Sequence, residues 1–199
     1  YHDFERKEAL AELLLFESTK TEPGKKITLA EYVERMPEEQ KEIYYMTGPD
    51  RNTAESSPYL EVFKEKGVEV LLMTDDIDDL IISSLGQYQE KELQSAIKGD
   101  LDLGDSGKKE ERQKEFSDLL ALMKEQLKDV VGEVRVSGRL KDSAVCLVAG
   151  EHDLDPQMEK MFRAMGQTVP RGQRSLEVNP DHPLITKMQS LFAADAKNE

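Results

Sequence analysis

Residues 43–73 read IYYMTGPDRNTAESSPYLEVFKEKGVEVLLM, and this stretch decides the fold of the chain around it. Its first residues, 43–46, are β-forming and end in a Thr-Gly-Pro turn, which predicts a strand. Ser57 can cap a helix that has proline at its first position and ends at Gly67. The apolar run 68–73 then predicts a second strand. Strand, helix and strand within about thirty residues form a βαβ unit, so the two strands should be parallel.

Weaker signals add further elements around this unit. Thr28 can cap a short helix, because a glutamate three residues later completes the spacing of a capping box. A helix over about 76–84 and a short strand within 92–98 should follow the βαβ unit. The segment 98–109, KGDLDLGDSGKK, holds glycines among charged residues, which is typical of a linker. We therefore expect a domain boundary near Gly104.

Sequence patterns in the second half of the chain predict a further set of helices and strands. An apolar stripe from Phe116 to Leu127 indicates one long helix over about 108–128. The run from Val145 to Ala149 is fully apolar, which indicates a central strand. The remaining predicted elements are strands at 134–136 and 176–178 and helices at roughly 155–165 and 183–194. Both halves are therefore expected to be mixed α and β layers.

Composition limits the class of protein. The chain has 199 residues, of which 38% are hydrophobic and 34% charged, enough for one large or two small domains. Its formal net charge of −14 repels nucleic acid phosphate and anionic lipid, so neither is an expected partner. We find no stretch long and apolar enough to span a bilayer and no signal peptide. The single cysteine, Cys146, excludes an intramolecular disulfide and fits a reducing compartment such as the cytoplasm.

Four longer stretches, collinear along the chain, resemble the heat-shock protein 90 family of chaperones in its bacterial form. They are FESTKTEPGK at 16–25, MPEEQKEIYYMTG at 36–48, SPYLEVFKEKGVEVLLMTDDID at 57–78 and LEVNPDHPLI at 176–185. The resemblance implies a small α/β/α unit with a parallel βαβ element at 1–103, which is the end of the family's middle domain. It also implies an α+β C-terminal domain with helices and a small sheet of about three strands at 104–199.

The resemblance further implies which parts of such a chaperone are present. The family's ATP site and catalytic arginine should lie before Tyr1, so ATP and Mg²⁺ belong to the full-length parent, and we expect no enzymatic activity and no cofactor in this chain. Because Tyr1 is not an initiator methionine, an excised fragment is expected. The family's dimerisation helices should lie beyond Glu199. The parent is then a homodimer, and the fragment a monomer or a weak, non-native dimer.

An enzyme is the main alternative from a different class. Asp75, Asp76, Asp78 and Asp79 directly follow a predicted parallel strand, where α/β enzymes bind ligands and where carboxylates can hold Mg²⁺. An acidic, magnesium-dependent enzyme centred on Asp75 and Asp78 is therefore one hypothesis. The other is that these residues cap the next helix and complement its dipole. Cys146 lies inside an apolar run, which indicates an inert core thiol, and the histidines lack metal-ligand spacing, so we expect neither catalytic nor metal-binding residues.

One predicted helix carries an apolar stripe rich in methionine, a flexible side chain that is common on surfaces with many partners. Core packing is the simple interpretation, but the resemblance implies that the matching helix offers these side chains to client proteins. Leu80 stands where some bacterial members have an aromatic residue that touches clients, so it joins the set. The client-binding residues expected are Leu154, Met158, Met161, Phe162, Met165 and Leu80. The implied function is binding and remodelling of partly folded clients and coupling of the middle to the C-terminal domain; a scaffold without client contact is a further alternative.

Overall fold

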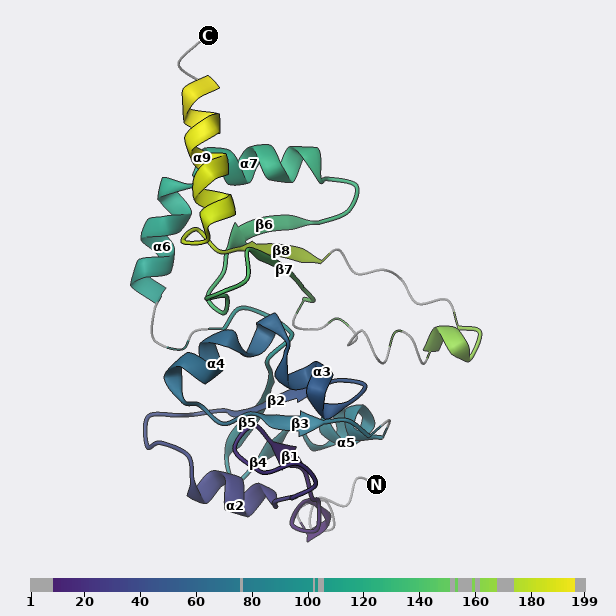
Figure 1. Cartoon of the computed structure of the whole chain (residues 1–199). Helices are drawn as coiled ribbons and strands as arrows, with labels where there is room; N and C mark the ends of the chain where they lie inside the picture. The colour runs from purple at the N-terminus through teal and green to yellow at the C-terminus, as the bar shows by residue number, and fades with distance from the viewer. Residues whose placement is uncertain are drawn as a thin grey trace. The chain divides into compact units, whose positions relative to one another are not determined.

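The computed structural model describes residues 9–75, 77–101, 103, 106–150, 153, 159, 162–167 and 174–195 (Figure 1). Contacts between residues divide the chain into two compact units that are interleaved in sequence. The first comprises Tyr1–Ser57, Phe63–Ile97 and Asp155–Gln167, and the second comprises Pro58–Val62, Lys98–Leu154 and Thr168–Glu199. These units are defined by contacts and not by independent folding, so the domain boundary expected near Gly104 stays a prediction.

The first unit contains a five-stranded mixed sheet in the order β1-β3-β2-β5-β4. Its strands are β1 (Glu17–Ser18), β2 (Ile43–Thr47), β3 (Leu71–Met73), β4 (Gln87–Tyr88) and β5 (Lys91–Ser95). β2 and β3 are parallel, with Tyr45 opposite Leu71, which confirms the pairing predicted for the βαβ unit. β5 also lies parallel to β2 and is the short strand expected within 92–98.

Helices cover both faces of this sheet, as an α/β/α unit requires. Between β2 and β3 the chain forms α3 (Arg51–Glu55), a 3-10 turn (Pro58–Leu60) and α4 (Glu61–Lys66), and elsewhere α2 (Leu29–Glu34) and α5 (Asp78–Leu85). Figure 1 shows α2 and α3 on opposite sides of the sheet. Successive residues of a strand point to opposite faces, so Ile43 and Tyr45 join the core on the side of α2, while Tyr44 meets Phe63 edge to face.

Local sequence explains where these helices begin and end. The Thr28 hydroxyl accepts the backbone N–H of Glu31 at 3.1 Å, and the Glu31 carboxylate accepts the backbone N–H of Thr28 at 2.8 Å. This is the capping box that the spacing predicts, and it satisfies two donors that the start of a helix leaves unpaired. Gly67 follows α4 with φ of 65°, a left-handed conformation that suits glycine and ends a helix.

The second unit contains a three-stranded sheet in the order β6-β8-β7. Its elements are β6 (Glu133–Val136), β7 (Val145–Val148), β8 (Ser175–Val178), α6 (Ser106–Glu115), α7 (Ser117–Gln126) and α9 (Pro183–Asp195). β8 is parallel to β6 and antiparallel to β7. Leu120 of α7, Val178 of β8 and Ile185 of α9 meet in one buried cluster, so helices and sheet share an apolar core.

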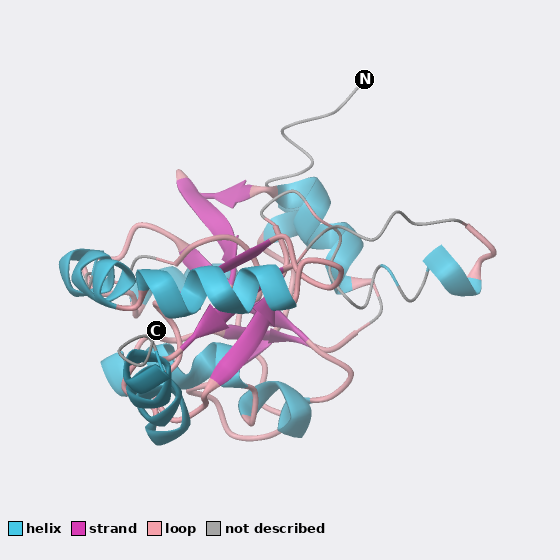
Figure 2. Cartoon of the chain, turned by 90° about the horizontal axis from the view of Figure 1, so that it is seen from above, coloured by secondary structure: helices cyan, strands magenta, loops and turns pink. Residues whose placement is uncertain are grey.

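The single long helix predicted over 108–128 is wrong, because the chain forms two helices there. Figure 1 shows α6 and α7 meeting at a steep angle, and Figure 2 shows the same bend from above. The bend falls at Phe116, whose backbone leaves the helical region at φ −98° and ψ 7° and whose side chain is buried. Burying this ring offsets the interruption of the helix. None of the helices in the described part of the chain is long and apolar enough to cross a membrane.

The prediction that residues 145–149 form a central strand is also wrong, because β7 lies at an edge of its sheet. Cys146 and Val148 point into a buried cluster, whereas Val145 and Leu147 are 41% and 38% exposed. A short, continuous apolar run predicts a strand, but it does not show whether that strand lies in the centre or at the edge of its sheet. β8, in which Glu177 lies between two apolar residues, takes the central place instead.

Candidate functional site

Most of the predicted client-binding stripe lies outside the described residues. Leu154, Met158 and Met161 fall there, so their exposure stays untested. Phe162 is described and half-buried, and Met165 is 63% exposed. The structure therefore brings two of the predicted residues onto one helical turn, with one apolar side chain open to solvent.

The end of this helical turn is well defined. Gln167 donates its backbone N–H to the carbonyl of Phe162 at 3.0 Å, and Gly166 donates to the carbonyl of Arg163 at 3.0 Å. With Gly166 at φ of 77°, this is a glycine-terminated helix end of the Schellman type. Met165 is thus held at the terminus of the turn, where its side chain is exposed.

Leu80 lies in α5, and its side chain is outside the described part of the structure. Ile77, which directly precedes α5, is 58% exposed. The sequence did not single out Ile77, although an apolar residue between acidic neighbours is the signal that could have done so. An apolar side chain is therefore available at the start of this helix, on a different element from Met165.

The prediction that the acidic cluster after β3 caps the next helix is wrong, because the N-cap residue of α5 is Ile77 and no side chain caps the helix there. Asp78 is buried, and its carboxylate accepts the backbone N–H of Asp75 at 3.0 Å. Burial raises the pKa of Asp78 above its usual range. Asp75 forms an exposed ion pair with Lys26 at 3.5 Å. Asp76 and the side chain of Asp79 lie outside the described residues. Elsewhere among the residues that are described, no three His, Cys, Asp or Glu side chains gather closely enough to hold a metal ion.

Cys146 has the environment predicted for an inert core thiol. It packs with Leu140 and Val148 and is 9% exposed. Burial, helped by the negative charge of Glu177, raises the pKa of the thiol to about 12. A thiol with this pKa is almost entirely protonated at neutral pH and is a poor nucleophile. The described histidine, His182, accepts the backbone N–H of Leu184 at 3.1 Å and so caps the start of α9.

A buried ionic network holds the second unit together, and the sequence analysis missed it. Glu177 of β8 is fully buried and accepts from Arg139 at 2.9 Å, Arg135 at 3.0 Å and the Ser137 hydroxyl at 2.7 Å. Both arginines also donate to the carbonyl of Gly99. The sequence contained a signal for it. Glu177 lies between two apolar residues of a predicted strand, and Arg135 and Arg139 lie in and just after another predicted strand. Buried charges of this kind need partners, and here they have them.

A second anchor in this unit is the carboxylate of Glu61. It accepts the backbone N–H groups of Lys141 at 2.6 Å, Asp142 at 2.8 Å and Ser143 at 3.1 Å. Burial alone would raise the pKa of Glu61, but these hydrogen bonds and that of the Ser143 hydroxyl lower it overall. Consecutive backbone N–H groups form a concave anion-binding nest, which Glu61 fills.

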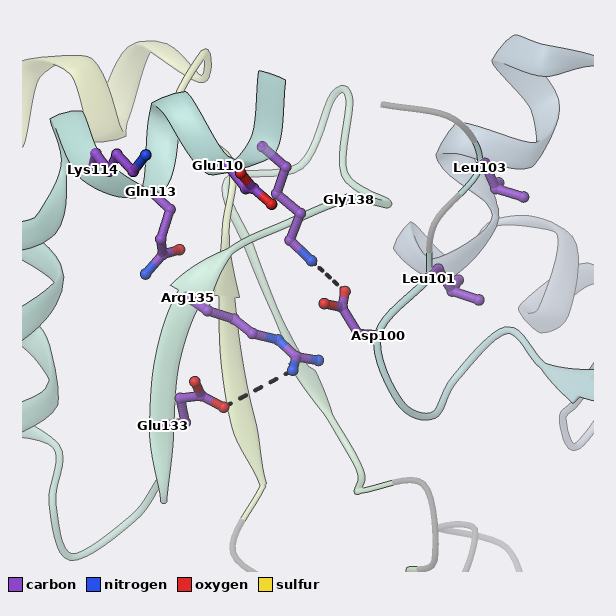
Figure 3. Close-up of a pocket in the computed structure, with 10 residues that line it drawn as sticks. Asp100, Leu101, Leu103, Glu110, Gln113, Lys114, Glu133, Arg135 and Gly138 are labelled. Atoms are coloured by element: carbon purple, nitrogen blue, oxygen red, sulfur yellow. Dashed lines mark hydrogen bonds and ion pairs between the residues drawn. The ribbon is translucent and has the colours of Figure 1, made fainter. Parts of the chain in front are cut away.

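The second unit also contains a cavity of about 520 Å³ beside β6 (Figure 3). Side chains from α6 and β6 and the segment around Leu101 line it. Figure 3 shows two ion pairs at its wall, one from Lys109 to Asp100 and one from Arg135 to Glu133. Among the described residues that line it, acidic and basic side chains are balanced in number, and no nucleophile stands next to a general base of the kind used in catalysis.

Comparison with known proteins assigns the chain to a family. A sequence model described as Hsp90 protein matches residues 1–199. The chain is 47% identical to the chaperone protein HtpG of Geobacter sulfurreducens over 205 aligned residues, which are all of this chain and 32% of that protein. It is 46% identical to the chaperone protein HtpG of Mycobacterium avium over 192 aligned residues, which are 94% of this chain and 30% of that protein. The chain thus spans about a third of the length of these curated relatives, and over its whole length it belongs to the Hsp90 family.

Proposed function

We propose that this chain is the middle-to-C-terminal segment of an ATP-driven bacterial chaperone and offers an apolar surface to partly folded clients in the cytoplasm. The observation that carries the proposal is the exposed side chain of Met165, which lies close in sequence to Phe162 on the helix that the family resemblance implies for client contact. Membership of the Hsp90 family over the full chain supports it. Methionine suits such a surface, because its flexible thioether adapts to different apolar partners.

The client surface can be tested by changing the exposed methionine. Met165→Ser should leave the unfolding midpoint nearly unchanged, within about 0.5 kcal/mol, because the side chain is already exposed. It should weaken binding of a fluorescently labelled, permanently unfolded client protein, measured by anisotropy. Val130→Ser is the matched control, since Val130 is 68% exposed in the second unit and outside the proposed surface. Equal effects of the two variants on client binding would favour the scaffold without client contact.

We propose that the ATP site of the chaperone lies outside this chain. We expect no heat of binding with Mg-ATP in calorimetry and no ATP turnover above buffer. The chain lacks a glycine-rich phosphate loop, and in its acidic cluster the Asp78 carboxylate already accepts the backbone N–H of Asp75. Micromolar ATP affinity would instead revive the hypothesis of an acidic, magnesium-dependent enzyme around Asp75 and Asp78.

We further propose that the parent works as a homodimer and that the chain alone is a monomer or a weak dimer. Leu184 and Leu191 of α9 are 56% and 55% exposed, and non-native pairing through them is opposed by the net charge of −14. Sedimentation at micromolar concentration should give the mass of a monomer. A tight dimer would show that this segment contains the dimerisation element after all.

A further inference from the structure

We propose that the segment Pro58–Val62 couples the two units, so that loosening of the second unit lowers the stability of the first. The contacts of this coupling segment place it in the second unit, whereas Ser57 before it and Phe63 after it belong to the first. The chain therefore passes into the second unit and returns within the crossover that joins β2 to β3. Coupling through such a segment requires that the residues on both sides of each crossing are firmly held.

Polar contacts of Glu61 and Val62 hold the coupling segment in the second unit. The Glu61 carboxylate accepts the three consecutive backbone N–H groups of the nest at 141–143 and the Ser143 hydroxyl. Val62 donates its backbone N–H to the Arg139 carbonyl at 3.1 Å. Hydrogen bonds to a charged acceptor are stronger than neutral ones, so the segment leaves this unit only by breaking several strong contacts at once.

The ring of Tyr59 adds a further attachment to the second unit. Its hydroxyl donates to the Leu147 carbonyl of β7, and burial raises the pKa of this hydroxyl above its usual range, so it stays protonated. The ring packs against the buried cluster that contains Cys146, and the Arg139 guanidinium lies 6.0 Å from its centroid. This distance is within the range of a cation–π contact. Polar and apolar contacts therefore both fix the segment.

The residue that follows the coupling segment is held as firmly in the first unit. Phe63 is 1% exposed and meets the Tyr44 ring of β2 edge to face, with the ring centroids 4.9 Å apart. Its carbonyl accepts the backbone N–H of Val68 at 2.9 Å. Val62 and Phe63 are neighbours on α4, so one helix begins in the second unit and ends in the first.

This arrangement predicts how a disturbance passes from one unit to the other. Proteins open locally in cooperative segments, and neighbouring residues of one helix belong to the same segment. When the second unit loosens, α4 loses the anchor at its first turn, and the hydrogen bonds of α4 and of β3 behind it open more often. The coupling is a free energy and is therefore reciprocal. It involves neither Phe162 nor Met165, so it does not depend on the client surface.

The test measures amide hydrogen exchange by mass spectrometry on the full chain. Ile185→Val removes one methylene from a side chain that is 1% exposed in the core of the second unit. Exchange in β8 should become about fivefold faster, because the core is weakened without being lost. If the segment couples the units, exchange in α4 and β3 should also become at least about threefold faster.

The same change is then made in a chain whose coupling segment is released. Tyr59→Phe/Glu61→Gln removes the hydroxyl donor and the charge of the anchor, and in this background Ile185→Val should speed exchange in α4 and β3 by less than about 1.5-fold. The matched background is Tyr44→Phe/Glu55→Gln. It makes the same chemical changes at a tyrosine and a glutamate whose side-chain partners, Glu42 and Arg51, lie in the first unit. It should keep the threefold response.

Three results would overturn the proposal. The first is unchanged exchange in α4 and β3 when Ile185→Val is made in the native chain. The second is an equal response in the released and the native backgrounds. The third is faster exchange in β5 but not in α4, which would place the coupling at the chain crossing before Lys98. Circular dichroism checks that each variant is folded, and if the released chain is not, Tyr59→Phe alone replaces it and should at least halve the response.

Discussion

Replacing Glu177 by glutamine should destabilise the second unit far more than the same change at an exposed carboxylate. Glu177 and Arg139 are both fully buried, 2.9 Å apart, and Arg135 donates to the same carboxylate. Glutamine keeps one acceptor oxygen but removes the charge, which leaves Arg139 buried without a counter-ion. Removing one partner of a buried pair costs about 3–5 kcal/mol, and we expect the lower end because the amide still accepts one hydrogen bond.

The matched control is Asp181→Asn. Asp181 also pairs with an arginine, Arg112, but their side chains are 70% and 41% exposed. An exposed pair contributes at most about 1 kcal/mol, so this variant should remain close to the native chain. The contrast between the two variants isolates the effect of burial, because the change in chemistry is identical.

The assay must report on the second unit alone, because two units can unfold separately. The chain has no tryptophan, so a Phe192→Trp background places a single fluorophore in α9 against the core of that unit. Urea unfolding followed by tryptophan fluorescence then gives the free energy of unfolding for each variant. If Glu177→Gln costs no more than Asp181→Asn, the buried network does not carry the stability assigned to it.

Three further changes test other parts of the structure. Cys146→Ser should cost about 1–3 kcal/mol by placing a hydroxyl in an apolar cluster, whereas Val145→Thr, on the exposed side of the same strand, should stay within about 0.5 kcal/mol; urea midpoints decide. Thr28→Ala should remove the capping box and cost about 1 kcal/mol, seen as faster amide hydrogen exchange in α2. Glu61→Gln should destabilise the chain at neutral pH by about 1 kcal/mol. Because the folded pKa of Glu61 is lowered, its stabilisation is present above the ordinary value of 4.5 and is lost as pH falls, so melting temperatures of native and variant chains should converge in acid.

The first unit could be predicted from sequence because its signals are local. The βαβ unit depends on a Gly-Pro turn, a helix that ends at Gly67 and an apolar run, all within 43–73, and the structure pairs the two strands as expected. The helix itself begins later than predicted, because Pro58–Leu60 form a 3-10 turn before α4, and α3 was not predicted. The capping box at Thr28 is likewise a property of four consecutive residues. Such local patterns predict structure correctly because the residues that form each turn, cap or strand are neighbours in the chain.

The features that escaped prediction depend on tertiary partners. The bend at Phe116 follows from burial of its ring among residues of β6, β8 and α9. The place of β7 at a sheet edge follows from which strand pairs with both neighbours. Glu177 would be expected on a solvent face by alternation alone, yet two arginines from another strand region allow it to be fully buried.

The candidate sites divide in the same way. Met165 was predicted because the stripe is periodic within one helix and resembles the family. The cavity beside β6 was not, because Asp100, Glu110 and Arg135 come from separate segments and only the fold brings them together.

The segment 98–109 shows why composition can mislead about order. Its glycines and charges are typical of a linker, but its first residues are bound to the second unit. Gly99 donates its backbone N–H to the carbonyl of Ala149 at 3.1 Å, its own carbonyl accepts from two guanidinium groups, and Leu101 is buried. Gly99 has φ of 62°, so glycine here permits a fixed bend rather than free motion. Glycine in a charged segment therefore indicates a change of direction, and only the hydrogen-bond partners decide whether that segment is ordered.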